Sequence, residues 1–539
     1  KLHMITKIIK DSLRENLKGL GINVLTGQIS LERPANRDHG DWSSNIALVT
    51  AKDAGRQARG LAEEIVNSLA TNLPDGITEV TAAGPGFINF RVSAELSYGI
   101  VLEVLEKKSR YGSSNRGSGK QVNVEFVSAN PTGPLHAGHA RGACYGDAIA
   151  NLLQYVGFSV HREFYMNDRG LQMKAFGRSL EARKNNESLP EDGYGGEYVI
   201  EWAKEMPAGL ALEEIITWGC EFAKNDQQDT LSELGIYFDT WFSEKSMIDN
   251  GEIDRVLANL AEKGMAYEKD GATWLSSVEF GDDKDRVLIK SDGEYTYLTP
   301  DVAYHRNKFE RSDWLINVWG ADHHGYIARM KAAMQALGYD SDALTVQVTQ
   351  LVKLLRAGEE VKLSKRQGDI IELRSIIEEI GADATRFMYL LQSVDSKQTF
   401  DLELAASQGM DNPVYYVQMA YARLCSIERN ANEHGFDFEI LPIDQLSVLG
   451  HQREMEIIRG LEILPEAIDL AARELAPHKI VTWVREFANS VHGFHHDCYV
   501  IGDGISEELT NARLNLVVAS IQGLKVGLDL LGVSAPNKM

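Results

Sequence analysis

Val122-Asn123-Val124-Glu125-Phe126 and Pro134-Leu135-His136-Ala137-Gly138-His139 are the two stretches that decide the fold of this 539-residue chain. Apolar and polar residues alternate in the first stretch, and this period of two predicts a β-strand. Proline and glycine between residues 131 and 134 then predict a tight, non-helical passage. From Ala140 to Leu152 apolar residues recur at helical spacing, and we expect Gly157 to end that helix in a left-handed conformation.

Two histidines, three residues apart, are therefore expected between the end of a strand and the N-terminus of the next helix. Unpaired backbone N–H groups and the helix dipole at such a place favour a phosphate. Gly138 between His136 and His139 leaves room for a flat base or ribose to approach the backbone. The pair lacks the HExxH spacing of a zinc protease. Paired histidines at a helix start can also be mere capping or surface residues, so this stretch alone does not decide a function.

A second motif, Lys362-Leu363-Ser364-Lys365-Arg366, follows the apolar run 344–355 far downstream. Two lysines on a polar loop suit a clamp on a polyphosphate. Taken alone, the motif fits an ordinary basic surface turn better than a phosphate clamp. The two motifs in this order and at this separation favour one shared nucleotide site.

The two motifs resemble the HIGH and KMSKS signatures of class I aminoacyl-tRNA synthetases. Three flanking stretches resemble arginyl-tRNA synthetases in particular: Glu125–Pro134, Asn167-Asp168 and Tyr297-Leu298-Thr299-Pro300-Asp301. The resemblance covers essentially the whole chain. It implies an ATP-dependent, AMP-forming arginine–tRNA ligase that makes arginyl-adenylate and then charges tRNA(Arg).

The resemblance also implies roles for the residues of both motifs. The expected catalytic residues are His136, His139, Lys362 and Lys365. The expected ATP-binding residues are Pro134, His136, Gly138, His139, Ser364 and Lys365. We expect Mg²⁺ to arrive with ATP, held by phosphate oxygens and water, and we expect no tightly bound protein metal.

A guanidinium group has five N–H donors in one plane and favours paired carboxylates. Glu125 and Asp301 are the candidate pair, with Tyr297 packed or hydrogen-bonded beside Asp301. The resemblance adds Ser128 and Asn130 near the α-amino end, and His323 where the family often has Gln. Asp301 could instead be an ordinary acidic residue in the first turn of a helix. A lysine substrate would also suit two carboxylates, so only the resemblance selects arginine.

The pattern along the chain predicts three domains. Residues 1–108 read as a small α/β domain with helices over 5–17 and 61–69 and a strand over 87–92. Residues 109–404 read as an α/β catalytic domain with a doubly wound, Rossmann-like parallel sheet split by a largely helical insertion. Its expected strands include 122–126, 158–165, 274–278, 294–298, 314–319 and 344–355. Residues 405–539 read as an all-α helical bundle, which the resemblance makes an anticodon-binding domain.

The same resemblance gives candidate contacts with tRNA. Phe87 and Asn89 match positions that contact a D-loop base, and an aromatic plus an amide can read one splayed base. Tyr416, Gln418 and Arg423 match the motif of the anticodon-binding bundle. Each aromatic residue could equally be part of a core.

Composition limits the class of protein. The formal net charge is −23, so a tRNA ligand has to be held by local basic surface. The four cysteines lie far apart and form neither a zinc knuckle nor a disulfide framework, which favours the reducing cytoplasm. The sequence contains no run of 18 uncharged apolar residues, so it predicts no membrane-spanning helix. We expect a monomer whose partners are tRNA(Arg), L-arginine and ATP, with neither DNA nor a membrane among them.

Two other functions fit parts of the sequence. One is a nucleotidylyltransferase that uses an HxGH motif on a small molecule, although it would not need the large helical segment after residue 405. The other is a non-catalytic tRNA-binding paralogue, which would have no chemical need to keep both motifs.

Overall fold

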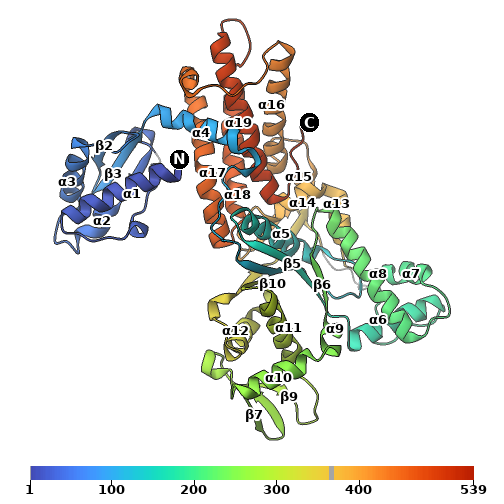
Figure 1. Cartoon of the computed structure of the whole chain (residues 1–539). Coiled ribbons are helices and arrows are strands. Elements are labelled where there is room, and N and C mark those ends of the chain that lie inside the picture. The colour runs from blue at the N-terminus through green and yellow to red at the C-terminus, as the bar shows by residue number, and fades with distance from the viewer. Residues whose placement is uncertain (1, 35, 363–369) are drawn as a thin grey trace.

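The computed structural model describes residues 2–34, 36–362 and 370–539, apart from the side chains of residues 2–4, 37 and 324. The chain forms a small N-terminal domain, a central α/β domain and a C-terminal helical bundle (Figure 1). In this view the bundle stands above the central sheet and the N-terminal domain lies to its left.

The N-terminal domain packs helices on a three-stranded antiparallel sheet of order β1-β3-β2. Residues 5, 9, 13 and 17 recur at helical spacing on α1, and they share a core with Leu61, Ile65 and Leu69 of α3. Both predicted helices and the predicted strand are confirmed. The elements are α1 (Leu2–Gly19), β1 (Trp42–Ser44), α2 (Ile46–Ala51), α3 (Ala58–Thr71), β2 (Ile77–Ala83) and β3 (Phe87–Val92).

The central sheet has five strands in the order β11-β10-β4-β5-β6, and all of them are parallel. The chain runs outward from β4 to one edge and then returns to the other side of β4. This is the predicted doubly wound topology, which brings the carboxyl ends of β4, β5 and β10 together at the switch point. The strands are β4 (Gln121–Glu125), β5 (Ser159–Met166), β6 (Thr240–Ser243), β10 (Trp314–Gly320) and β11 (Leu344–Thr349).

The two faces of the sheet differ in polarity. Val122, Val124 and Phe126 pack with α5 (Ala140–Tyr155), and a Cβ at Gly146 of α5 would lie 2.2 Å from the Phe126 ring. The opposite face lies against α11 (Leu298–Arg311), with α12 (Ile327–Ala336) in the same core. Asn123 and Glu125 point to that side and are also buried, so the alternation of apolar and polar residues separates two buried faces.

Two of the predicted sheet strands are wrong. Residues 272–275 belong to a separate antiparallel sheet of β7 (Ala266–Lys269), β8 (Ala272–Leu275) and β9 (Arg286–Ile289). Residues 294–298 form no strand, and Leu298 begins α11. A period of two marks a strand but cannot assign it to a sheet. In the central sheet, the strand that the sequence does not predict is β6, whose four residues are too few to show a period of two.

The predicted strand over 344–355 is two strands in different sheets. The first part is β11, and the second part is β12 (Val352–Arg356). β12 pairs with β13 (Glu359–Glu360) and runs parallel to β14 (Gln398–Asp401). β12 and β13 therefore form the hairpin that leads to Lys362.

The insertion between β5 and β6 is helical, as predicted, and it has a small core of its own. Its helices are α6 (Leu171–Lys184), α7 (Glu197–Glu205) and α8 (Leu212–Glu233). Two short helices, α9 (Glu244–Asp249) and α10 (Glu252–Glu262), follow β6.

The C-terminal bundle is confirmed and shares one continuous core with α5. It consists of α16 (Pro413–Glu433), α17 (Gln452–Glu474), α18 (His478–Asp497) and α19 (Glu507–Leu531), and α13 (Leu373–Ile380), α14 (Ala382–Tyr389) and α15 (Leu402–Ala406) precede it. α4 (Ala94–Lys107), which follows the N-terminal sheet, packs along α17 and α19. Within the described residues, α19 alone is long and apolar enough to cross a membrane, and 83% of its most apolar stretch is buried inside the protein.

Candidate active site

His136 and His139 lie side by side where the chain enters α5. Their ring centroids are 3.8 Å apart. The backbone N–H of Gly138 donates to Nδ1 of His136, and the backbone N–H of His136 donates to Nδ1 of His139, each over 3.1 Å. Because each Nδ1 accepts a hydrogen bond, the neutral form of each ring carries its proton on Nε2.

The surroundings keep both imidazoles neutral. Burial lowers the pKa of His136, and burial together with the nearby His136 lowers the pKa of His139 to about 3. Each ring therefore keeps one N–H donor for a ligand, and two such donors beside a helix N-terminus suit phosphate oxygens. A Cβ at Gly138 would lie 2.9 Å from the His136 ring, so this glycine makes room for the imidazole where the sequence suggested a base or ribose.

The backbone next to these histidines pairs with the chain that follows the lysine motif. The N–H of Ala137 donates to the carbonyl of Ile371 over 2.8 Å, and the N–H of Leu373 donates to that of Leu135 over 2.9 Å. Lys362 is exposed, and Ser364 and Lys365 lie outside the described residues. The described chain resumes at Ile370, and the next residues therefore lie beside His136.

Arg141 joins the start of α5 to the sheet that precedes Lys362. Its buried guanidinium donates to the carbonyls of Gln350 (3.0 Å), Ser396 (2.6 Å) and Ser393 (2.7 Å). These carbonyls lie where β12 and β14 begin, and β12 runs on through β13 to Lys362. Arg141 therefore ties the short helix-start unit that carries the two histidines to the starts of β12 and β14.

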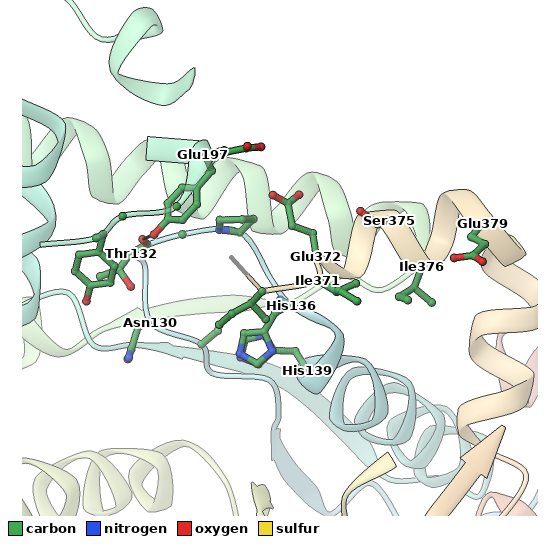
Figure 2. Close-up of a pocket in the computed structure, with 18 of the residues that line it drawn as sticks. Asn130, Thr132, His136, His139, Glu197, Ile371, Glu372, Ser375, Ile376 and Glu379 are labelled. Carbon is green, nitrogen blue, oxygen red and sulfur yellow. Dashed lines mark hydrogen bonds between the residues drawn. The ribbon is translucent and has the colours of Figure 1, made fainter. Parts of the chain in front are cut away.

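A cavity of about 630 Å³ opens beside the histidines (Figure 2). Four separate parts of the chain line it: the loop before α5, residues 194–198 of the insertion, Arg356 of β12, and the chain from Ile370 to Glu379 that enters and forms α13. Its size lies within the range of small-molecule sites. Polar groups that face it include Asn130, Thr132, His136, His139, Glu372 and Ser375.

A second group of polar residues lies near the carboxyl ends of β5, β6 and β10. Glu244, the first residue of α9, hydrogen-bonds the Tyr165 hydroxyl, and Tyr326 hydrogen-bonds Asp301. Burial raises the pKa of Tyr165, and the carboxylates of Glu244, Asp301 and Glu125 raise it further. Three carboxyl groups therefore surround one tyrosine.

Glu244 is a site residue that sequence reasoning missed. Burial raises its pKa, and Arg169 opposes that shift. The signal in the sequence was weak, because Glu244 directly follows the four-residue strand β6. An acidic residue at the carboxyl end of a strand in a doubly wound sheet is a candidate ligand-binding residue, and here the strand itself is too short to be predicted.

Glu125 already has partners in the structure. Its Oε1 accepts from Lys308 Nζ over 2.8 Å, and its Oε2 accepts from the Ser128 hydroxyl over 2.9 Å. Ser128 and the preceding Val127 have φ values of +48° and +68°, a left-handed backbone that is uncommon for residues other than glycine and is found at functional sites. Because Lys308 compensates Glu125, Asp301 and Glu244 are the carboxylates better placed to face a cationic ligand.

Two further predicted members of the arginine site, Tyr297 and His323, have exposed side chains. Tyr297 is 98% exposed, so the predicted contact with Asp301 is wrong. Tyr297 precedes the first turn of α11, and the four-residue spacing brings side chains together only inside a helix. His323 is exposed, with its ring centroid 6.3 Å from that of Trp319. Asn130 lines the cavity, and its carbonyl accepts from Gln227.

Three of the candidate tRNA residues lie at least partly at the surface. Phe87 of β3 is 36% exposed. The Tyr416 hydroxyl donates to Asn489, and its ring centroid lies 4.5 Å from that of His492. Arg423 donates to Nδ1 of the same histidine over 2.9 Å. Tyr416, Arg423 and His492 therefore form one polar and aromatic cluster between α16 and α18.

The other two candidate tRNA residues are buried. Asn89 is 5% exposed within β3. Gln418 is 8% exposed, and its Nε2 donates to Asp383 Oδ2 over 2.8 Å and to the carbonyl of Ser534 over 3.0 Å. The Gln418 amide therefore joins α16 to α14 and to the C-terminal tail.

Comparison with known proteins covers nearly the whole chain. Three family models match: "Arginyl tRNA synthetase N terminal domain" over 6–92, "tRNA synthetases class I (R), catalytic domain" over 100–199 and 210–430, and "DALR anticodon binding domain" over 417–539. The chain is 43% identical to arginine–tRNA ligase 1 of Halalkalibacterium halodurans, covering 98% of this chain and 99% of that one. It is 42% identical to the arginine–tRNA ligase of Bacillus subtilis, covering 99% and 100%. The fold matches that of Thermus thermophilus arginyl-tRNA synthetase with a TM-score of 0.77 at 21% identity, covering 99% and 100%.

Proposed function

The chain belongs to the arginyl-tRNA synthetase family, and we propose that its reaction takes place between the two histidines and the acidic group around Tyr165. It is an ATP-dependent arginine–tRNA ligase. The arginine carboxylate attacks the α-phosphorus of ATP and pyrophosphate leaves. A terminal hydroxyl of tRNA then attacks the adenylate and releases AMP.

The donors for the first step come from both motifs. The Nε2–H groups of His136 and His139 bind the phosphates of ATP, next to Pro134 and Gly138. Lys362, Ser364 and Lys365 hold the departing pyrophosphate. In such a reaction preorganised donors supply most of the rate enhancement, and the loss of one donor costs about 3–4 kcal/mol of barrier. The supporting observation is that residues 371–373, after the lysine motif, are hydrogen-bonded to residues 135–137, and that Arg141 binds the carbonyl of Gln350, just before the hairpin that leads to Lys362.

Magnesium enters with ATP in this scheme. Among residues 2–34, 36–362 and 370–539, no group of three or more His, Cys, Asp or Glu side chains could hold a metal ion. Phosphate oxygens and water therefore supply most of its ligands. The ion would neutralise charge on the phosphates, while the chain's own donors orient them.

The guanidinium of arginine binds at Asp301 and Glu244, beside Tyr165 and Tyr326. Glu125, Ser128 and Asn130 lie toward the α-amino end. The proposed pair of carboxylates is thus Asp301 with Glu244, and not Glu125 with Asp301 as the sequence suggests. The reason is that the Lys308 ammonium already compensates the charge of Glu125. Two carboxylates suit a planar, five-donor group.

The outer domains hold tRNA(Arg) in this proposal. Phe87 contacts the corner of the tRNA, and Tyr416 with Arg423 contacts the anticodon loop. Arginine, ATP and tRNA(Arg) are the partners, and the enzyme works as a monomer in the cytoplasm. Asn89 and Gln418 support the backbone around these positions, since both are buried.

The two alternative functions have less support. A small-molecule nucleotidylyltransferase would not need a match to the anticodon-binding family model over 417–539. A non-catalytic paralogue would not need the pocket or the neutral pair of imidazoles.

One experiment tests the proposed function directly. The purified protein is incubated with total tRNA, ATP and each of the twenty amino acids in turn. Arginine alone is expected to become esterified to tRNA. Charging with lysine, or formation of an adenylate without any esterification to tRNA, would contradict the proposal.

A further inference from the structure

A charged, fully buried side chain lies directly beneath the arginine site. Lys308 of α11 is 0% exposed. Its ammonium donates to Glu125 Oε1 over 2.8 Å and to Asn317 Oδ1 over 2.7 Å, and it lies 4.5 Å from the centre of the Tyr304 ring. An ammonium has three N–H donors, and these three partners account for all of them.

The position of Lys308 fixes the orientation of Asn317. A lysine can only donate, so the oxygen of the Asn317 amide has to face it. The amide nitrogen then faces the other way, and it lies 2.7 Å from Nε2 of His305. Because that nitrogen donates, His305 Nε2 is the unprotonated acceptor of the ring.

The tautomer of His305 follows from this orientation. With Nε2 unprotonated, the proton of the neutral ring is on Nδ1. Nδ1 lies 2.7 Å from the backbone carbonyl of Asp301 and 3.3 Å from its carboxylate Oδ1. An unbroken chain of polar contacts therefore runs from Glu125 through Lys308, Asn317 and His305 to Asp301.

We propose that Lys308 is a positioning residue for arginine recognition, which acts through Asn317 and His305 to hold the carboxylate of Asp301. The inference rests on the proposed function, because Asp301 is taken as a ligand of the guanidinium. The opposite tautomer would turn a lone pair of His305 toward two oxygens of Asp301, and that contact would be repulsive. Lys308 also compensates the charge of Glu125, which leaves Asp301 as the oriented carboxylate.

The geometry explains why Asp301 needs such support. Its side chain is 32% exposed in the first turn of α11, so its rotation is limited by the Tyr326 hydroxyl on one side and by the His305 ring on the other. A guanidinium binds best to a carboxylate held in its own plane. A rigid contact one helical turn away limits that rotation before the ligand arrives.

A purely structural role predicts different results. Removal of one partner of a buried ion pair destabilises a protein, whatever its distance from the ligand. The test therefore has to separate the affinity for arginine from the stability of the fold. Two variants of His305 do so, since Asn places an N–H donor near the position of Nδ1, and Gln places its amide near the position of Nε2.

The experiment measures the KM for arginine and the KM for ATP in tRNA charging, together with Tm, for wild type, His305→Asn and His305→Gln. We expect His305→Gln to raise the KM for arginine roughly threefold to tenfold, the range for one lost hydrogen bond to a neutral group. His305→Asn should keep that KM within about twofold of wild type by retaining the same donor. Equal values in the two variants, or a larger increase in His305→Asn, would overturn the proposal.

Lys308→Met provides a second, independent measurement. It should raise the KM for arginine while the KM for ATP stays unchanged. The matched control is Arg513→Met, which removes a buried cation from its 2.6 Å pair with Glu454 in the C-terminal bundle. The control should lower Tm and leave the KM for arginine unchanged. An unchanged KM in Lys308→Met would overturn the proposal, and if that variant does not fold, the His305 pair decides.

These outcomes are separate from a failure of the proposed function. If wild type does not charge tRNA with arginine, the proposed function fails before any variant is compared. If wild type charges arginine and His305→Gln behaves like wild type, only the role of Lys308 and its chain of contacts is wrong.

Discussion

His139 and Glu244 illustrate how burial changes what one side chain can do at this site. Burial lowers the pKa of the histidine and raises that of the glutamate, because it disfavours the charged form of both. The histidine is thereby kept as a neutral donor for phosphate. Neither shift can be read from residue type or spacing, since both depend on which elements cover the side chain.

The lowered pKa of His139 predicts a pH-dependent stability. The unfolded chain binds a proton near pH 6.5, but the folded chain binds it only near pH 3, so His139 lowers the stability as pH falls between these values. From pH 7.5 to 5.5 this loss is on the order of 1 kcal/mol. His139→Asn keeps an acceptor for the His136 N–H and should lose less stability over the same interval, as measured by urea unfolding. An identical loss in both proteins would contradict the assignment.

At the scale of elements, the pattern of the chain predicts local structure better than it predicts pairing. The alternation at 122–126 and the helical spacing after Ala140 correctly predict β4 and α5. No pattern indicates that 135–137 pairs with 371–373, because that contact uses backbone groups far apart in sequence. The same limitation explains why the pattern at 274–278 predicts a strand of the wrong sheet.

The anchoring of the lysine segment predicts the effect of changing Arg141. Arg141→Met removes three hydrogen bonds to the carbonyls where β12 and β14 begin, so the segment that carries Lys362 loses its fixed starting point. We expect kcat for arginine-dependent ATP–pyrophosphate exchange with tRNA present to fall roughly tenfold or more, while the KM for arginine changes less than about twofold.

Arg141→Lys is the matched control, because it can restore part of the bonding to the same carbonyls. It should recover a measurable part of kcat. Equal kcat values in wild type and Arg141→Met would show that this anchor has no part in positioning the motif.

At the scale of the whole molecule, the domains are joined by shared cores and ion pairs. α5 belongs to the same hydrophobic core as the C-terminal bundle. Arg33 of the N-terminal domain pairs with the buried Glu462 of α17 over 2.5 Å, and Arg116 pairs with Asp469 of α17. A deletion of the bundle would therefore uncover the core behind the histidines, so single substitutions test the tRNA contacts more cleanly.

The cluster of Tyr416, Arg423 and His492 predicts a separate effect on tRNA binding. Arg423→Ala removes the guanidinium at the surface between α16 and α18. We expect it to raise the KM for tRNA roughly fivefold to a hundredfold, the range for loss of one arginine contact with a nucleic acid, with the KM for arginine unchanged. Steady-state charging kinetics check both values, and an unaltered KM for tRNA would remove this cluster from the interface.

The central claim is that the two motifs and the acidic group act on one reaction. A crystal structure of the enzyme with arginine, tRNA and a non-hydrolysable ATP analogue tests it most directly. We predict phosphate oxygens within hydrogen-bond distance of Nε2 of His136 and His139, Lys365 at the β- and γ-phosphates, and the guanidinium at Asp301. Phosphates bound away from the histidines, or a guanidinium that contacts neither Asp301 nor Glu244, would contradict it.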